Sequence, residues 1–268
     1  MPAKSKMMPK IAVIWFPGNN CENETKRACE AAGMHADIVR WNSAACLDNY
    51  DGFIFCGGWS YEDRIRAGVI SAKDPVMVGV NEQAQKGRPV LGICNGCQVL
   101  VEAGMIPGLK DKVEMALAPN INPFVSGFYC DWVRLKHIPW KKCAFNAFYE
   151  KDEIISMPIA HGEGRFATRE KGLIHELEKN GQILFKYCDE NGHIDEKYPA
   201  NPNSSIANIA GITNKQGNIL AMMPHPERAF FKKQLKEKSM HNFEDAMNFA
   251  KAARIFESMR EYITGVIK

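Results

Sequence analysis

Short apolar runs alternate with amphipathic segments along the first part of the chain. Continuous apolar runs bounded by turn residues are typical of buried strands, and apolar positions three or four apart are typical of helices. The β-α-β alternation predicts an α/β fold, with a doubly wound, mostly parallel sheet and helices on both faces. Asn20 is expected to cap the first helix and Gly33 to end it. The predicted strands are 11–16, 35–41, 52–56 and 89–93, and the predicted helices are 21–32, 75–86 and 98–103.

The second half of the chain is less regular. Loop and antiparallel strands are predicted over 107–139, and Gln216-Gly217 is a plausible hairpin turn. Further strands are predicted at 154–159, 182–187, 206–213 and 218–223, and a helix at 242–263. We expect one domain over 1–268, with a flexible N-terminus at 1–9, an insertion at 107–149 and a C-terminal helical extension at 230–268.

Composition narrows the class of protein. A chain of 268 residues with a net charge of +3 carries too little charge to indicate nucleic-acid or membrane binding. The apolar stretch 11–16 stops at Pro17-Gly18, so it is too short for a membrane span. Nine cysteines without a regular spacing favour a reducing, cytoplasmic location.

The segment 91–99 carries the strongest chemical signal, because it joins a predicted strand to a predicted helix. Within it, Gly92-x-Cys94-x-Gly96 has the pattern of a nucleophile elbow with cysteine as the nucleophile. Such a turn presents the side chain beside a helix N-terminus, whose positive dipole end favours a thiolate and an oxyanion. The motif therefore predicts acyl transfer through a thioester on Cys94.

A cysteine nucleophile needs a base, and the base needs a group that orients it. His225 follows the predicted strand 218–223 between two prolines, and Glu227 stands two residues further on. We therefore predict a catalytic triad of Cys94, His225 and Glu227.

The oxyanion hole is predicted from two N–H groups. Gly58 belongs to a Gly-Gly turn after the strand 52–56, and Asn95 follows the nucleophile. Taken alone, the cysteine, the Gly-Gly pair and the Pro-His-Pro segment each have a common role in folding rather than in catalysis. Buried cysteines mostly act as small hydrophobic residues, and Gly-Gly or Pro-His-Pro mark turns. Their combination at strand ends carries the prediction.

The chain resembles class I, triad-type glutamine amidotransferases, which are flavodoxin-like, and more narrowly the glutaminase subunits of phosphoribosylformylglycinamidine synthase. The resemblance covers about residues 11 to 228. The matching stretches are Pro-Gly-x-Asn-Cys-Glu at 17–22, Gly-Gly-Trp-Ser-Tyr-x-Asp at 57–63, the elbow at 91–100, Pro-Ile-Ala-His-Gly-Glu-Gly-Arg-Phe at 158–166 and Met-Pro-His-Pro-Glu-Arg at 223–228.

The resemblance implies a reaction. Cys94 would attack the side-chain amide of glutamine, His225 would pass the thiol proton to the leaving ammonia, and water would release glutamate from the thioester. Gln98 and Gly57 are expected to contact the substrate. We expect no metal and no cofactor in this chain, which has no Gly-x-x-x-x-Gly-Lys-Ser/Thr loop.

The same resemblance implies partners. A PurL-type synthetase subunit, holding ATP and Mg²⁺, would use the ammonia to convert formylglycinamide ribonucleotide to formylglycinamidine ribonucleotide in purine biosynthesis. The complex would thus be a ligase, with this chain as its glutaminase. A small PurS-type subunit would bridge the two.

Several points stay open in the sequence. His161 lies in a glycine-rich loop. Three interpretations stay open: the side chain lies beside the catalytic site, lies at a subunit interface, or simply caps a strand. Cys97 forms Cys-x-x-Cys with the nucleophile, which also suggests a redox pair, a metal pair or a reversible disulfide. Glu62 replaces the glycine usual in its turn. Three alternatives remain, namely a γ-glutamyl hydrolase, a protease-like relative and a non-enzymatic glutamine sensor. The triad and the matching stretches argue against all three.

Overall fold

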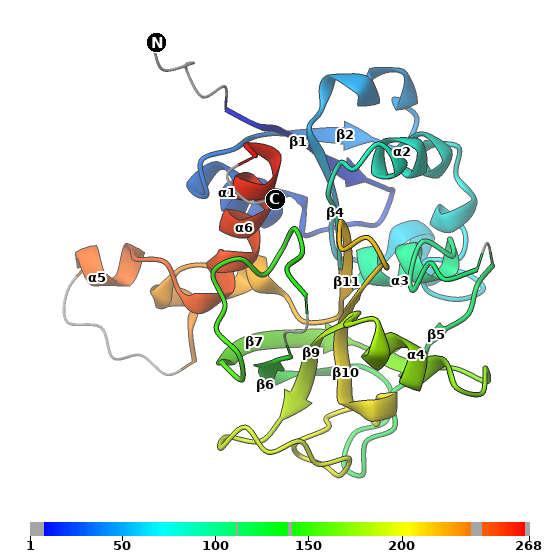
Figure 1. Cartoon of the computed structure of the whole chain (residues 1–268), viewed down its shortest axis with the longest axis vertical. Coiled ribbons are helices and arrows are strands. Elements are labelled where there is room, and N and C mark those ends of the chain that lie inside the picture. Colours follow the sequence, from blue (N-terminus) through cyan, green and yellow to red (C-terminus); the bar gives the residue numbers. More distant parts are fainter. Residues whose placement is uncertain (1–7, 111, 139–140, 237–242, 266–268) are drawn as a thin grey trace.

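A nine-stranded mixed sheet runs through the molecule (Figure 1). The computed structural model describes residues 8–110, 112–138, 141–236 and 243–265. The strand order is β2-β1-β3-β4-β11-β10-β9-β6-β7. Five strands are parallel to one another, namely β1 (Lys10–Trp15), β2 (His35–Arg40), β3 (Gly52–Phe55), β4 (Val90–Ile93) and β11 (Ile219–Met222).

The other half of the sheet is antiparallel, so the sheet is more mixed than the sequence suggests. It contains β10 (Ile209–Thr213), β9 (Ile183–Cys188), β6 (Tyr129–His137) and β7 (Ile154–His161). A separate pair joins β5 (Ala116–Ala118) to β8 (Arg165–Ala167). Strand β6 comes from the 107–149 segment and lies between β9 and β7. The status of that segment as an insertion stays a prediction.

Helices cover both faces of the parallel half, as predicted. Figure 1 shows α1 and α6 on one side of β1 and β4, and α2 and α3 on the other. The α/β fold expected from the alternating pattern is therefore confirmed. The helices are α1 (Glu22–Ala31), α2 (Val76–Gln85), α3 (Asn95–Glu102), α4 (Leu173–Lys179), α5 (Phe243–Met247) and α6 (Arg254–Ile263).

The predicted helix 242–263 is wrong in its middle. Its first residue lies outside the described part of the chain, and the rest divides into α5 and α6. Between them the backbone leaves the helix, where Ala250 N donates to Phe230 O at 2.7 Å and Phe249 stacks edge-on against Phe230. This tertiary contact outweighs the helical periodicity.

Smaller differences concern ends and caps. Asn20 does not cap α1: Cys21 occupies the cap position, and Thr25 Oγ1 donates to its carbonyl at 2.7 Å. Helix α3 begins at Asn95, three residues earlier than predicted. Helix α4 was not predicted, and the predicted flexibility of 1–9 falls mostly on residues that the structure does not describe.

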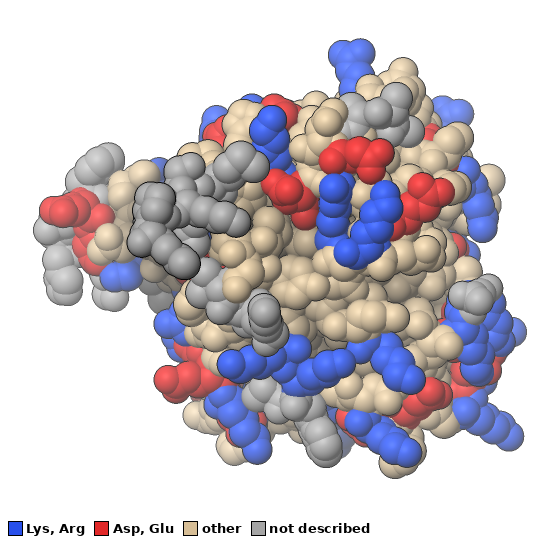
Figure 2. All heavy atoms as spheres, turned by 45° about the horizontal axis from the view of Figure 1, so that its top comes forward, with Lys and Arg blue, Asp and Glu red and all other residues tan. Residues whose placement is uncertain are grey.

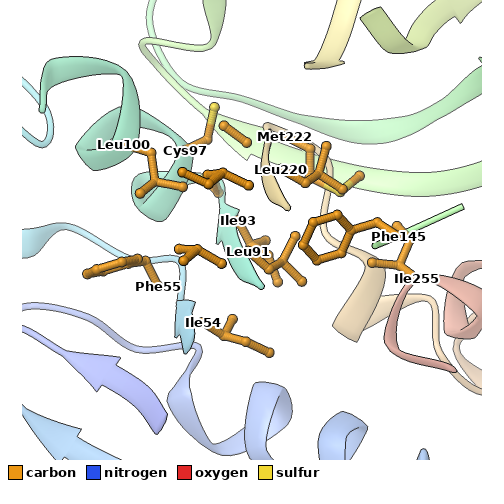
Figure 3. Close-up of a cluster of buried hydrophobic side chains, with 14 of the residues drawn as sticks. Ile54, Phe55, Leu91, Ile93, Cys97, Leu100, Phe145, Leu220, Met222 and Ile255 are labelled. Carbon is orange, nitrogen blue, oxygen red and sulfur yellow. The ribbon is translucent and has the colours of Figure 1, made fainter. Parts of the chain in front are cut away.

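The core surrounds β4. Leu91 and Ile93 lie in the middle of an apolar cluster, with Leu100 of α3 on one side and Phe145 and Ile255 on the other (Figure 3). All five side chains are fully buried, and each aliphatic one contributes roughly 1.5–3 kcal/mol relative to exposure. This packing fixes the carboxyl end of β4, where the elbow begins.

The surface of the molecule carries charges of both signs. Figure 2 shows Lys and Arg side chains interspersed with Asp and Glu over one face. No helix in the described ranges has the length and apolar character needed to cross a membrane.

Candidate active site

Cys94 occupies a strained turn between β4 and α3. Its φ of +51° and ψ of −106° are unfavourable for a residue with a Cβ, and such strain is concentrated at functional sites. The turn also needs its glycines, because a Cβ on Gly96 would lie 2.0 Å from Phe55 O and one on Gly92 2.6 Å from Gly96 O. The predicted elbow is therefore present, with Cys94 at the helix N-terminus.

His225 and Glu227 form a buried pair at the end of β11. A short 3-10 turn over Pro226–Arg228 brings the side chains together, and His225 Nδ1 lies 2.5 Å from Glu227 Oε1. Burial alone would lower the pKa of His225, but the Glu227 carboxylate and then the Cys94 and Cys21 thiols raise that pKa well above its usual range. The carboxylate therefore increases the proton affinity of the imidazole, as a general base requires.

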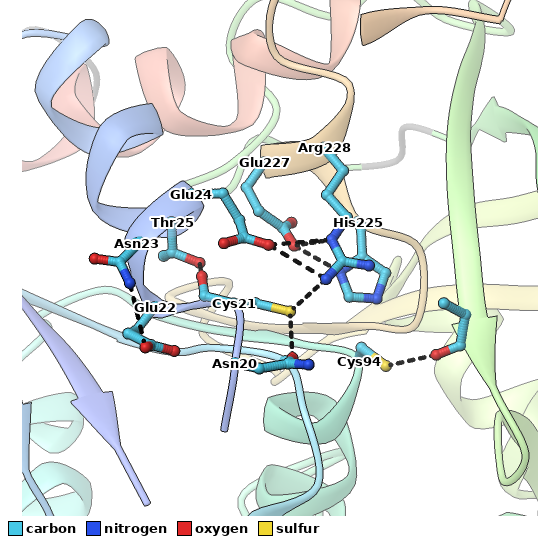
Figure 4. Close-up of polar contacts among 12 residues, drawn as sticks. Asn20, Cys21, Glu22, Asn23, Glu24, Thr25, Cys94, His225, Glu227 and Arg228 are labelled. Atoms are coloured by element: carbon cyan, nitrogen blue, oxygen red, sulfur yellow. Dashed lines mark hydrogen bonds and ion pairs between the residues drawn. The ribbon is translucent and has the colours of Figure 1, made fainter. Parts of the chain in front are cut away.

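Gly57 lies next to both the nucleophile and the base, and Figure 4 shows the side chains of Cys94 and His225. A Cβ at Gly57 would lie 2.9 Å from His225 Cε1, 3.0 Å from Cys21 Sγ and 3.5 Å from Cys94 Cβ. Cys94 Sγ donates to the Ala160 carbonyl at 3.5 Å. His225 Nε2 is buried and has no hydrogen-bond partner among the described residues, so this nitrogen is available to accept a thiol proton.

The loop that follows β3 is clamped to the start of α3 by Asn95. Its Oδ1 accepts from Ser60 N at 3.1 Å and from Asn19 Nδ2 at 3.3 Å. Its Nδ2 donates to Gln98 Oε1 at 2.9 Å and to Asp63 Oδ1 at 3.1 Å. The side chain therefore holds two loops and the helix in one arrangement.

The two predicted oxyanion donors border this clamp. Gly58 has a φ of +132°, and a Cβ there would lie 2.6 Å from Asn19 Cα, so only glycine fits. Asn95 is the first residue of α3, and the first N–H groups of a helix lack intrahelical acceptors. The role of both N–H groups as an oxyanion hole stays a prediction.

A cavity of about 170 Å³ opens beside the nucleophile. Gln98 lines the cavity and donates to Glu163 O at 2.7 Å, and its contact with a substrate stays a prediction. Trp59 and Phe128 pack against each other with ring centroids 5.9 Å apart, and both border the cavity. Its lining residues are Gly58, Trp59, Asp63, Cys94, Gln98, Phe128, Ala160, His161, Gly162 and Glu163.

His161 ends β7 and faces this cavity. Its imidazole is buried, and burial together with the His225 charge lowers its pKa to about 3, so the ring is neutral. A Cβ on Gly164 would lie 2.1 Å from the ring, which explains the glycine at that position. The structure thus puts His161 beside the catalytic pair, which the sequence left open.

Cys21 and Arg228 complete the surroundings of the pair, although sequence reasoning gave neither a role. Arg228 donates to Cys21 Sγ at 3.0 Å and to Glu24 Oε1 at 3.2 Å (Figure 4). The signal was present, since Cys21 and Arg228 both lie in stretches that carry the family resemblance. Asp63 also lies in such a stretch and was overlooked, whereas Asn19 occupies an unmatched position within one.

Cys21, His225 and Glu227 have donor atoms within 4.8 Å of one another, a spacing that could hold a metal ion. Two of the atoms already have partners, because Arg228 bonds to the Cys21 sulfur and His225 Nδ1 bonds to Glu227. A guanidinium on the sulfur would also repel a cation. We therefore assign no metal here, and the expectation that the chain binds none stays a prediction.

Cys97 lies away from the cavity. Its side chain is fully buried in the core near Leu100 (Figure 3), and both Cys94 and Cys97 are free thiols in the structure. Burial, together with Cys94, raises the pKa of Cys97 well above its usual range, which makes this thiol a poor nucleophile. The arrangement does not favour a disulfide with the nucleophile.

Glu62 fits the turn in which glycine is usual. It has a φ of +60° between Tyr61 at +52° and Asp63 at +51°, a left-handed run that costs about 1–2 kcal/mol per residue. Its side chain is 73% exposed and bonds to Arg64 at 2.8 Å. The side chain therefore points into solvent.

Comparisons with known proteins agree with this geometry. A family model described as the CobB/CobQ-like glutamine amidotransferase domain matches residues 8–263. The PurQ subunit of phosphoribosylformylglycinamidine synthase from Methanothrix thermoacetophila is 44% identical over 95% of this chain and 98% of its own length. The PurQ subunit from Pyrococcus horikoshii is 47% identical over 83% of this chain and 90% of its own length.

A solved structure agrees as well. The structure of PurLQS from Thermotoga maritima includes a chain with a TM-score of 0.73 and 29% identity, covering 96% of this chain and 100% of that one. The chain therefore belongs to the CobB/CobQ-like glutamine amidotransferases, and within them to the PurQ subunit family, as the sequence predicts.

Proposed function

We propose that the chain is the glutaminase subunit of phosphoribosylformylglycinamidine synthase. The observation that carries this proposal is the convergence of Cys94, His225 and Glu227 beside a cavity of about 170 Å³, in a chain that belongs to the PurQ family. Family membership gives the substrate, and the convergence supplies the groups that the chemistry requires.

The proposed mechanism starts with the thiol of Cys94. His225 Nε2 accepts the thiol proton, and the sulfur attacks the side-chain carbonyl carbon of glutamine. Imidazolium formed in this step is stabilised by Glu227 on Nδ1. The N–H groups of Gly58 and Asn95 stabilise the oxyanion of the tetrahedral intermediate.

Collapse of that intermediate breaks the C–N bond. The imidazolium gives its proton to the leaving nitrogen, which departs as ammonia and leaves a glutamyl thioester on Cys94. His225 then takes a proton from water, the resulting hydroxide attacks the thioester, and glutamate and the free thiol are formed. Gln98 holds the substrate in the cavity during both halves.

The proposal extends to partners. The ammonia passes to a PurL-type synthetase subunit, which converts formylglycinamide ribonucleotide to the amidine with ATP and Mg²⁺, and a PurS-type subunit bridges the two. The solved PurLQS assembly that contains a similar chain supports this arrangement. The proposal gives this chain no cofactor of its own and a cytoplasmic location.

Glutamate release from glutamine tests the proposal. The assay is run with the chain alone, and then with the synthetase and bridging subunits, formylglycinamide ribonucleotide and ATP. We expect the loaded complex to stimulate release, and Cys94→Ala to abolish it. Release that is indifferent to the synthetase would contradict the assignment to purine synthesis, and release by Cys94→Ala would contradict the mechanism.

A further inference from the structure

A cation and a second carboxylate lie next to the catalytic pair of His225 and Glu227. Arg228 follows Glu227 in the turn after β11, and Glu24 lies in the first turn of α1 (Figure 4). The proposed mechanism gives neither side chain a step. Their charges nevertheless act on the carboxylate that orients the base, because that carboxylate forms an ion pair with Arg228.

The guanidinium of Arg228 is held by residues at the start of α1. Its Nη2 donates to Cys21 Sγ at 3.0 Å and to Glu24 Oε1 at 3.2 Å, and its Nε donates to the same oxygen at 3.3 Å (Figure 4). The Cys21 thiol donates in turn to Asn20 Oδ1 at 3.3 Å. Three hydrogen bonds therefore fix the position of this positive charge.

The fixed charge lies close to the triad carboxylate. Arg228 Nε is 3.9 Å from Glu227 Oε1, the same oxygen that bonds to His225 Nδ1. This separation is too long for a hydrogen bond, so the interaction is one between charges. The Glu227 side chain is fully buried and the Arg228 side chain is 35% exposed, so solvent screens the interaction only in part.

Other titratable groups also surround the pair. The turn that carries it packs against α1, β7 and the turn before α6, and Gly57 of the loop after β3 lies next to it. The groups that act on the pair from these elements and from the elbow are Cys21, Cys56, Cys94 and His161. Burial raises the pKa of Cys21 and of Cys56, and lowers that of His161 to about 3, so these three groups are neutral.

Two further charged residues lie on the same elements. Lys251, in the turn before α6, pairs with Glu153 at 3.1 Å. Glu22 of α1 acts on Cys56. Neither Lys251 nor Glu22 forms an ion pair with Glu227 within the described part of the chain, so the ion pairs lead from Glu227 through its neighbour in the turn to α1.

We propose that Arg228 is a positioning residue that sets the proton affinity of the catalytic His–Glu pair, and that Glu24 holds its guanidinium and offsets part of its charge. A cation beside the pair disfavours protonation of the pair, whereas an added carboxylate favours it. The two residues therefore act in opposite directions. The inference rests on the proposed glutaminase function and adds how its general base is tuned.

The test is the pH profile of kcat/KM for glutamine in the complete loaded complex. Arg228→Gln leaves Glu24 unopposed, so the acidic limb, where the pair becomes protonated, should move to higher pH by about 0.5–1 unit. Glu24→Gln leaves the cation unopposed, so the limb should move to lower pH. The double variant removes both charges, and its limb should lie between those of the single variants.

Three further variants separate charge from shape. Arg228→Lys keeps the charge but not the fork of donors, so its limb should lie closer to that of the parent than the limb of Arg228→Gln. Arg27→Gln and Glu30→Gln change exposed charges elsewhere on α1 and are the matched controls. Both controls should keep the profile of the parent.

A second measurement does not depend on turnover. The rate at which iodoacetamide alkylates Cys94 is followed across the same pH range by mass spectrometry of its peptide, in the chain without glutamine. Because the thiolate and the pair share one electrostatic environment, this profile should shift in the same directions in Arg228→Gln and Glu24→Gln.

Shifts of opposite sign in Arg228→Gln and Glu24→Gln would support the proposal. Shifts of the same sign, or a lower kcat/KM at every pH with an unmoved limb, would overturn it, because a merely structural role lowers the rate without moving the limb. Absence of glutamate release by the parent complex would instead contradict the proposed function, and the alkylation profile would then decide the role of Arg228 by the same criterion.

Discussion

Nδ1 of His225 lies 2.5 Å from Oε1 of Glu227, and the two side chains are almost wholly removed from solvent. In such surroundings a carboxylate interacts strongly with an imidazolium, because little water screens the charges. The contact also fixes the orientation of the ring, and leaves Nε2 to face the nucleophile. The pair therefore sets both the geometry and the proton affinity of the base.

Replacing Glu227 with glutamine tests this role. The amide keeps the size of the side chain and removes the charge, so the pKa of His225 should fall toward that of a buried, unpaired imidazole. We expect kcat for glutamine hydrolysis to fall at least tenfold, on the order of a lost acid–base contribution. The pH profile of kcat/KM measures the shift. A profile identical to that of the parent would show that the charge is not used.

The same pair predicts how stability depends on pH. Folding raises the pKa of His225 above its ordinary value of 6.5, although burial opposes the shift. Such a group stabilises the folded state below its unfolded pKa, and the contribution is lost as the pH rises through the folded pKa. The stability advantage of the parent over Glu227→Gln should therefore be largest near about pH 6 and shrink in alkaline solution.

Urea unfolding of the parent and of Glu227→Gln at several pH values measures this advantage. A difference in unfolding free energy that is constant from about pH 6 to about pH 9 would contradict the linkage.

Asn95 is predicted to matter through its side chain as well as its N–H. Asn95→Ala removes four hydrogen bonds and leaves buried partners such as Ser60 N unsatisfied. We expect a loss of about 2–4 kcal/mol in unfolding free energy, together with a lower kcat. Asn248→Ala, at an exposed position, is the control and should stay close to the parent. Wild-type kcat in Asn95→Ala would show that the loop keeps its shape unaided.

Gly57→Ala is predicted to damage catalysis more than folding. The added Cβ would lie 2.9 Å from His225 Cε1 and 3.0 Å from Cys21 Sγ, so the base must shift. A displacement of about 1 Å in a catalytic group costs on the order of 100-fold in rate. Gly162→Ala serves for comparison, since its Cβ would meet nothing closer than 3.9 Å. Similar kcat values for the two variants would contradict the crowding argument.

The proximity of Cys94 and His225 could be predicted from the sequence because each of them follows a strand. Cys94 and His225 come directly after apolar runs, and those runs become neighbours when β4 pairs with β11. Of the elbow glycines, Gly92 has a local steric reason, the nearby Gly96 carbonyl, whereas Gly96 is required by Phe55 O of the neighbouring strand. The parallel half of the sheet follows from the same alternation.

Other features depend on contacts between distant segments. The cavity is lined by Asp63 and Glu163 from two different loops, and no local pattern in the sequence reports that arrangement. The break before α6 depends on Phe249 packing against Phe230, although the apolar spacing continues through it. The antiparallel half depends on β6 entering between β9 and β7, which is also a long-range pairing.

The central claim is that Cys94 forms a glutamyl thioester, and it can be tested directly. The loaded complex is mixed with glutamine, quenched in acid during turnover, and examined by mass spectrometry of its peptides. We predict a glutamyl adduct on the peptide that holds Cys94, absent from Cys94→Ala. Rapid glutamate release with no adduct on Cys94, or an adduct on another residue, would contradict the account.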